Sequence, residues 1–455
     1  MSSDQPENDL PGEWHGDLSL SPLKEASDFI KSTDSYTREK RHAAGCPVFR
    51  AHPGVRSTLI TDHAGMEAVF RAPPEVLDRE ETPGFGALTM FTDELLEGVV
   101  PALVAHAGNH DPARALIDGA MALRMPAFEP ACRAVLDGGW AALQGADGDE
   151  GDEANFQHAI YQTAAGVMFQ WLFGIERGPV GAEHAAWVKQ IFGLKADTWL
   201  ASFFARKLKS GPAPEVVAWS RSWLEAIREC APYPEFVEIG AAVGVSEREV
   251  APQLMFAASF NGTAGAFATL YPALAHLSVD GTLRRALSNE LEVFYKGTRS
   301  LDALDALPFL EAFFLESMRH YGRPRQYYRR AMKDLSIPTS EGESVPVKAG
   351  TRLCLVATVA RQDTNVYGPT ATVFDPVRFL NDPSLKAHVH PFGPPAGGGS
   401  PYGCAGAVNG TAPRLWKVLA ASLGRDTRWR LHPEPRPNLD AFEGVEPAEL
   451  TWSTS

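Results

Sequence analysis

The stretch that decides the fold reads Pro391-Phe-Gly-Pro-Pro-Ala-Gly-Gly-Gly-Ser-Pro-Tyr-Gly-Cys404-Ala-Gly-Ala407. It places Cys404 in a loop rich in glycine and proline, directly ahead of an apolar segment from about Leu415 to Leu423 that favours a helix. Such a loop can present a thiolate at a helix N-terminus, where backbone N–H groups and the helix dipole stabilise the negative charge that iron binding needs. A lone cysteine is more often a buried structural residue, so the upstream motifs decide between the two.

Two charged motifs precede this loop. In Glu316-Ser-Met-Arg319 a carboxylate and a guanidinium stand three residues apart on a helix predicted from Leu310 to His320, so both lie on one face. Alone, this pair would be an ordinary helical ion pair. The segment Phe374-Asp-Pro-Val-Arg378-Phe379 follows, and Arg378 in its proline-anchored turn could complete a charged network with Glu316 and Arg319.

The segment from Ala251 to Val279 carries no charged residue and is long enough to span a membrane. Polar residues and two prolines interrupt it, and no aromatic or basic belt flanks it, so we expect a long buried central helix instead. Its middle, Phe260-Asn-Gly-Thr-Ala-Gly-Ala, consists mostly of small residues. Glycine destabilises a helix, so these positions indicate that something flat, such as a cofactor, approaches the backbone closely.

The rest of the chain predicts a mainly α protein with a small β region. Residues 1 to about 25 are polar and proline-rich and indicate a flexible lead-in, followed by a single domain over residues 26–455. Residues 48–61 suggest a short hairpin, and residues 113–267 have a mainly helical periodicity. Short β-type runs, Ser344–Val347 and Leu353–Val356, flank the turn signal Ala349-Gly350.

Composition excludes several classes of protein. With 455 residues, 44% hydrophobic and 22% charged, the chain is an ordinary globular protein, and its net charge of -14 argues against binding nucleic acid or anionic membranes. The five cysteines form an odd set without a CxxC pair, which fits a reducing compartment better than disulfides or a zinc finger. The N-terminus lacks a secretory signal, so we expect a cytoplasmic protein without a membrane anchor.

In this order, the motifs resemble the cytochrome P450 superfamily. The Glu-x-x-Arg helix is followed by Arg329-x-x-x-x-Asp334, a hairpin ending Lys348-Ala-Gly350, the Phe-x-Pro-x-Arg-Phe segment and the Cys-x-Gly loop. The resemblance implies the cytochrome P450 fold, with a long central helix over haem b. It further implies that Cys404 is the proximal ligand of the iron, and that Glu316, Arg319 and Arg378 form a structural core beneath the haem.

The same resemblance implies residues that bind the haem propionates. Arg329 is one, because an arginine fork pairs well with a carboxylate. The alternative is a surface arginine, since Arg330 stands beside it. In His110-Asp-Pro-Ala-Arg114, the spacing of His110 and Arg114 is similar to that of a second propionate contact, although Pro112 interrupts it.

The central helix departs from the oxygen-activating members of the superfamily. Dioxygen cleavage needs protons from an acid followed by an alcohol, but no Asp or Glu occurs from residue 251 to 279, and Thr263 has no acidic neighbour. The segment Phe260-Asn261-x-x-x-Gly265 instead resembles the allene oxide synthase and hydroperoxide lyase family, as does the lengthened loop before Cys404. Pro401-Tyr-Gly and Ala264 depart from that family's pattern.

This second resemblance implies an enzyme that rearranges fatty acid hydroperoxides without NADPH, a reductase or dioxygen. Asn261 would orient the hydroperoxide, with Thr263 as the other candidate catalytic residue; the alternative for Asn261 is a cap on local backbone. The sequence leaves open an allene oxide or aldehydes as product. Two other classes remain: a monooxygenase or peroxygenase that uses Thr263 and ordered water, and a haem-thiolate sensor.

Overall fold

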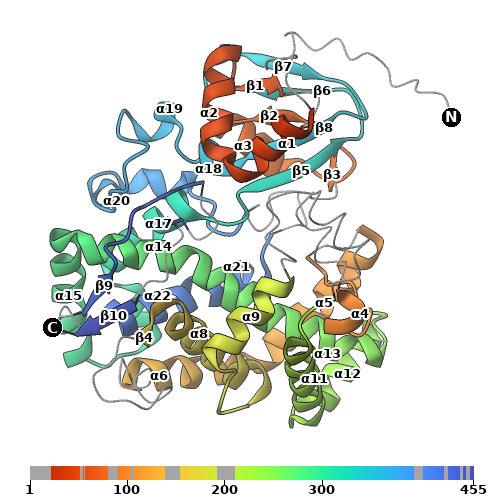
Figure 1. Cartoon of the computed structure of the whole chain (residues 1–455), viewed down its shortest axis with the longest axis vertical. Coiled ribbons are helices and arrows are strands. Elements are labelled where there is room, and N and C mark those ends of the chain that lie inside the picture. The colour runs from red at the N-terminus through yellow and green to blue at the C-terminus, as the bar shows by residue number, and fades with distance from the viewer. Residues whose placement is uncertain are drawn as a thin grey trace. The chain divides into compact units, whose positions relative to one another are not determined.

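The chain is mainly helical, and its short strands form three small sheets (Figure 1). The computed structural model describes residues 22–51, 55, 57–79, 91–103, 107–138, 154–191, 211–393, 403–424, 429–440, 444–446 and 451–454. The predicted fold class, mainly α with a small β region, is confirmed. Two compact units make up the chain, and each consists of three separate stretches of sequence.

The first unit comprises Met1–Thr82, Gly322–Phe374 and Ala387–Gly403. Its helices are α1 (Pro22–Lys31), α2 (Thr33–Ala44), α3 (His63–Arg71), α18 (Ala357–Ala360) and α19 (Thr364–Tyr367). Its strands are β1 (Val48–Arg50), β2 (Thr58–Ile60), β3 (Leu77–Arg79), β5 (Gln326–Ala331), β6 (Leu335–Pro338), β7 (Ser344–Val347) and β8 (Arg352–Val356).

A five-stranded sheet in the order β1-β2-β8-β5-β3 organises this unit. The predicted hairpin is confirmed, because β1 and β2 pair antiparallel with Val48 opposite Ile60. Strand β8 lies between β2 and β5 and is almost entirely buried, as its run of apolar residues indicates. In β7, by contrast, exposed and buried residues alternate, as in a strand with one covered face. The predicted turn is also present, with Gly350 at φ 82°.

The second unit comprises Pro83–Tyr321, Asp375–Lys386 and Cys404–Ser455. Its helices are α4 (Thr92–Leu95), α5 (Ala107–Arg124), α6 (Phe128–Gly138), α8 (Phe156–Phe173), α9 (Gly181–Ile191), α11 (Pro214–Glu229), α12 (Tyr233–Ala242), α13 (Glu247–Phe256), α14 (Gly265–Val279), α15 (Gly281–Lys296), α16 (Leu301–Asp305), α17 (Pro308–Tyr321), α20 (Val377–Asn381), α21 (Ala405–Val408) and α22 (Thr411–Gly424). Shorter turns are η2 (Met125–Ala127) and, across the boundary of the units, η4 (Pro383–His388). Strands β4 (Ala154–Asn155), β10 (Thr451–Thr454) and β9 (Trp429–His432) form an antiparallel sheet.

The predicted central helix is confirmed. It runs without a break through α13, the π-helical segment η3 (Ala257–Ala264) and α14. A capping box formed by Ser246 and Glu249 begins it, and Asp280 ends it and caps the next helix, α15. Among the helices that the structure describes, none combines the length and the apolar character that a membrane crossing requires.

The N-terminal boundary needs a correction. The lead-in was expected to reach about residue 25, but α1 already begins at Pro22, where proline suits the first turn of a helix. Residues 1–21 lie outside the described part of the chain. The chain divides into two compact units, each made of separate stretches of sequence. The single domain over residues 26–455 stays a prediction.

Candidate functional site

Cys404 occupies the N-cap position of α21, with extended backbone angles of φ -70° and ψ 134°. Its sulfur accepts hydrogen bonds from the backbone N–H groups of Gly406 and Ala407. Burial raises the pKa of the Cys404 thiol, whereas these N–H groups and the guanidinium of Arg114 act in the opposite direction. A bound metal cation would supply the charge that keeps the sulfur ionised. The arrangement therefore suits a metal-binding thiolate.

The surroundings of Cys404 agree in part with the sequence interpretation. The apolar segment predicted to form a helix lies in α22, which α21 and a short turn separate from Cys404. Residues 394–402 of the loop lie outside the described part of the chain. Two other cysteines have a different character: Cys132 and Cys354 are completely buried, and burial raises the pKa of each thiol to about 12. They are structural residues of the core.

Glu316, Arg319 and Arg378 form the predicted network. Arg319 donates two hydrogen bonds to the Glu316 carboxylate, from Nε to Oε2 and from Nη2 to Oε1, each 2.7 Å long. Arg378 on α20 donates from Nε to Oε1 over 3.3 Å, and the backbone N–H of Asp375 reaches the same oxygen at 2.7 Å. The side chains of Glu316 and Arg319 are 0% exposed. This network joins α17 to α20 inside the second unit.

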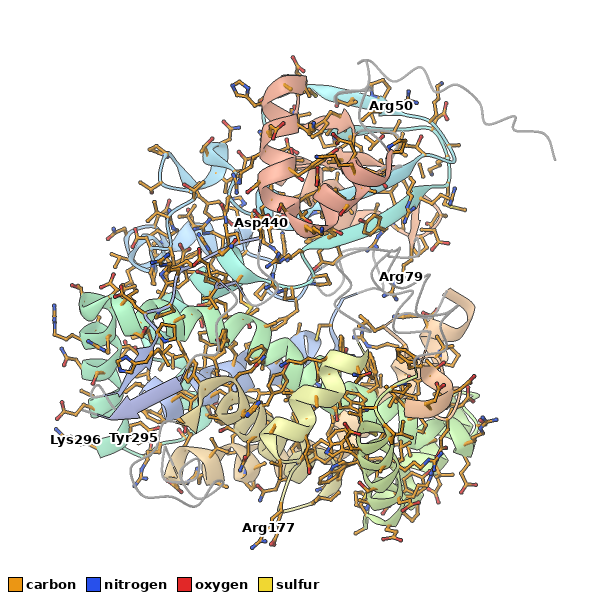
Figure 2. All side chains as sticks on the ribbon, viewed as in Figure 1. Arg50, Arg79, Arg177, Tyr295, Lys296 and Asp440 are labelled. Atoms are coloured by element: carbon orange, nitrogen blue, oxygen red, sulfur yellow. The ribbon has the colours of Figure 1, made fainter. Side chains whose placement is uncertain are left out.

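Surface ion pairs provide a contrast to this network. Lys296 lies at the end of α15 and points outward (Figure 2). Its Nζ atom lies 2.6 Å from Glu292 Oε1, but both side chains are mostly exposed. Water and salt screen such a pair, so it contributes little to stability. The buried network is the one with structural consequences.

The central helix has an open face in its middle. Residues 251–260 are all buried, but Asn261 is exposed, and Gly262, Gly265 and Ala266 are partly exposed. Their spacing places these residues on one side of the helix. A Cβ atom added at Gly265 would meet no atom of the described residues within 4 Å, so these residues leave space beside the backbone there. The face that carries Asn261 and Gly265 can therefore accept a flat group.

Gly262 serves a different purpose from the one predicted. A Cβ atom at this position would lie 2.5 Å from the Cε atom of Met168, which comes from α8. Here a side chain of the protein itself approaches the helix backbone, so at Gly262 the expected cofactor contact is replaced by helix packing. At Gly265 the approach of a cofactor stays a prediction.

The open face begins in the π-helical segment η3 and continues into the first turn of α14. In such a segment each N–H donates to the carbonyl five residues back, which adds a residue to the turn and often marks a functional site. The backbone N–H of Gly265 bonds to the Phe260 carbonyl in this way. The hydroxyl of Thr263 likewise donates to the Ala258 carbonyl over 2.9 Å, and Thr263 is 0% exposed. Thr263 was predicted as a candidate catalytic residue, but its hydroxyl lies within the helix rather than on the open face.

A buried histidine supports the π-helical segment. His184 on α9 donates from Nε2 to the carbonyl oxygen of Ser259 over 3.0 Å. Burial lowers the pKa of His184 to about 4, so the ring is neutral at physiological pH. Its neighbours are the rings of Tyr161, Trp187 and Trp219. The hydrogen bond therefore fixes the backbone two residues before Asn261.

His110 and Arg114 stand one turn apart on α5, and the helix accommodates Pro112 between them. Helix α5 contacts α21, which brings the Arg114 charge close enough to Cys404 to act on its pKa. Arg114 Nε bonds both carboxylate oxygens of Asp118, at 3.0 and 2.9 Å. His110 is buried, and its Nδ1 lies 2.9 Å from Asp111 Oδ1. The propionate contact proposed for the two residues stays a prediction.

Arg329 lies on β5 in the first unit. It is only 4% exposed, and its Nη1 donates to the Tyr328 carbonyl over 2.9 Å. The alternative of a surface arginine is therefore wrong for Arg329, whereas its neighbour Arg330 is exposed. A buried guanidinium suits an anionic group such as a propionate, and this role stays a prediction.

Sequence reasoning missed two features. The π-helical segment leaves no mark in the local pattern of apolar residues. A cluster of His63, Glu67 and His390 in the first unit was also missed, although the spacings His63-x-x-x-Glu67 and His388-x-His390 could have indicated it.

These observations fit an iron porphyrin. The sulfur of Cys404 offers a soft anionic ligand, and the open face at Gly265 leaves space for a flat ring. The family model for cytochrome P450 matches residues 246–397, from the start of the central helix to the loop that precedes Cys404. The mainly helical architecture with a small β region is that of the cytochrome P450 fold, and the cofactor of this fold is haem b.

Three relatives are similar over nearly the whole chain. An epoxyalcohol synthase of Ectocarpus siliculosus is 28% identical over 454 residues, which cover 95% of this chain and 94% of that protein. A mitochondrial hydroperoxide bicyclase of Plasmodiophora brassicae is 29% identical over 441 residues, covering 92% and 78%. A mitochondrial hydroperoxide bicyclase of Ectocarpus siliculosus is 26% identical over 462 residues, covering 97% and 89%. Two relatives are thus named mitochondrial, and the cytoplasmic location of this chain stays a prediction.

Proposed function

We propose that this chain rearranges a fatty acid hydroperoxide at its haem, without a reductase, an electron donor or dioxygen. The observation that carries the proposal is the open face of the central helix, where Asn261 is exposed and no acid occurs from residue 251 to 279. The Thr263 hydroxyl is bonded to the Ala258 carbonyl, so it does not replace the missing acid. Oxygen activation needs delivered protons and electrons, whereas a hydroperoxide arrives with its O–O bond already reduced.

Haem b, bound through the Cys404 thiolate, would supply the electron that cleaves this bond. The protein's part is to position the substrate. Asn261 presents a neutral carboxamide that can both donate and accept hydrogen bonds, so it can hold a hydroperoxide group in one orientation. Among the described residues its side chain has no hydrogen-bond partner, which disfavours the alternative role as a backbone cap.

We further propose that both oxygens stay in the product. Breaking the O–O bond leaves one oxygen on its carbon, where it closes onto the neighbouring double bond as an epoxide; the hydroxyl then adds to the carbon chain, so no atom or net electron is lost. The names of the relatives, one epoxyalcohol synthase and two hydroperoxide bicyclases, favour this isomerisation. An allene oxide synthase would release water instead, and a hydroperoxide lyase would yield aldehydes.

Product analysis tests this proposal. The purified, haem-loaded chain is mixed with a linoleate or linolenate hydroperoxide without reductant, and the products are identified by mass spectrometry and magnetic resonance. We expect an epoxyalcohol isomer with the mass of the substrate. A product that has lost one water would indicate a dehydratase, and chain-cleaved aldehydes would indicate a lyase. Hydroxylation that requires a reductase and dioxygen would show a monooxygenase and contradict the proposal.

A further inference from the structure

Three side chains of the first unit converge on one point. His63 and Glu67 are four residues apart on α3, so they share a face of that helix, and His390 reaches them from a distant part of the sequence. One donor atom from each lies within 4.8 Å of the others. His63 Nε2 lies 3.8 Å from Glu67 Oε1, and His390 Nε2 bonds to the same oxygen.

The surroundings hold these side chains in place. His63 is 5% and His390 6% exposed. Asp62 caps the N-terminus of α3 by accepting from the Gly65 N–H, and the backbone N–H of His63 donates to Asp363 Oδ2 over 3.0 Å. The ligand-bearing turn of the helix is therefore fixed at both its backbone and its cap.

The exposed side chain of Arg71 binds the second oxygen of Glu67. Its Nε donates to Glu67 Oε2 over 2.8 Å, which leaves Oε1 directed at the two imidazoles. Burial raises the pKa of Glu67, but hydrogen bonds from His390 and Arg71 outweigh this effect and lower it to about 2. Such supporting hydrogen bonds orient the ligands of metal sites.

We propose that His63, Glu67 and His390 form a binding site for Zn²⁺, made of residues other than those assigned to the haem. Two imidazole nitrogens and one carboxylate oxygen are a ligand set that zinc prefers, whereas Mg²⁺ and Ca²⁺ prefer oxygen ligands throughout. Three protein ligands leave a fourth position for water. His63 Nε2 now donates to the His388 carbonyl over 3.2 Å, so zinc binding requires the tautomer with its proton on Nδ1.

Calorimetric titration of the haem-loaded full chain with ZnCl₂, after removal of adventitious metal with a chelating resin, tests the site. We expect one zinc per chain. Substitution His390→Gln or Glu67→Gln should weaken binding by at least about 100-fold, because loss of a ligand costs more than loss of a supporting hydrogen bond. The matched control is His42→Gln, which removes an exposed histidine of α2 and should leave zinc binding unchanged.

Thermal unfolding gives a second readout. Zinc should raise the melting temperature of the wild type, because a ligand that binds the folded state stabilises it, and an equal concentration of Mg²⁺ should not. Glu67→Gln keeps an oxygen for the bond to His390, so this variant should fold, keep its haem absorbance and lose the zinc-dependent shift. The proposal is overturned if the wild type binds no zinc, or if the ligand variants bind it as well as His42→Gln does.

Discussion

His184 Nε2 donates a hydrogen bond of 3.0 Å to the carbonyl oxygen of Ser259, two residues before Asn261. The donor comes from α9 and the acceptor from the π-helical segment of the central helix, so this contact links the proposed catalytic residue to the surrounding core. Ser259 and His184 are both 0% exposed. A residue that orients a substrate must itself be held in place. The hydrogen bond from His184 helps to hold the backbone next to Asn261.

Substitution His184→Phe should lower turnover of the hydroperoxide while haem content stays normal. It leaves the Ser259 carbonyl buried without this donor, at a cost of about 1–3 kcal/mol, and frees the segment before Asn261. His184→Gln retains an N–H donor and should recover most of the turnover. Steady-state kinetics measure the loss of turnover, and thermal melting measures the loss of stability. If the Phe and Gln variants have equal kcat, the hydrogen bond of His184 does not affect turnover and the residue only fills space.

Buried histidines should make the chain less stable in mild acid. Burial lowers the pKa of His184 and of His276 to about 4, from an ordinary value of 6.5. Between these values the unfolded chain binds protons that the folded chain does not, so the free energy of unfolding falls as the pH falls from 6.5 towards 4. Each histidine contributes up to about 1.4 kcal/mol per pH unit. Urea unfolding at several pH values checks this, and an unchanged slope in His184→Gln would contradict it.

Cys404→Ala should lose the haem or its thiolate spectrum. The sulfur of Cys404 is the proposed ligand of the iron, and alanine offers no replacement. Cys230→Ser is the matched control, because Cys230 is also partly buried but caps the end of α11. Absorbance spectra of the ferrous carbon monoxide complex measure the ligation. A full thiolate spectrum in Cys404→Ala would show that another residue binds the iron.

Glu316→Gln should destabilise the second unit by roughly 3–5 kcal/mol, because it leaves the buried guanidiniums of Arg319 and Arg378 without their anion. Haem content should fall with it. Lys296→Ala removes an exposed ion pair and should leave unfolding unchanged. Denaturant unfolding of both variants makes the comparison, and equal stability would mean that the network is no stronger than a surface pair.

The sequence predicted those parts of the site that depend on local spacing and chain order. Glu316 and Arg319 lie one turn apart on a helix, and Arg378 follows in a turn fixed by proline, so their charges and order indicated the network. The order of residues in β7 and β8 likewise matches their burial: exposed and buried residues alternate in β7, and β8 is mostly a run of buried apolar residues. Asn261 was singled out by the resemblance of Phe260-Asn261-x-x-x-Gly265 to the allene oxide synthase and hydroperoxide lyase family, and the structure places it on the exposed side of the central helix.

The rest depends on contacts between distant residues. The π-helical segment is stabilised by His184, which stands 75 residues before Ser259 in the sequence. Thr263 was a candidate catalytic residue because it supplies a hydroxyl in the central helix, whereas the structure shows that this hydroxyl donates to the Ala258 carbonyl. The His63, Glu67 and His390 cluster joins residues separated by 323 positions. The spacing of His63 and Glu67 shows that they share a helix face, but it does not show that His390 meets them.

The rate of hydroperoxide consumption under argon, with no electron donor, tests the central claim most directly. The wild type should turn over linoleate hydroperoxide at the same rate in argon as in air. Asn261→Ala should be roughly 100-fold slower with its haem in place, because the substrate is no longer oriented. Thr263→Ser, which keeps the hydroxyl bonded to Ala258, should match the wild type. If the wild type consumes no hydroperoxide until a reductase and dioxygen are added, the claim is wrong.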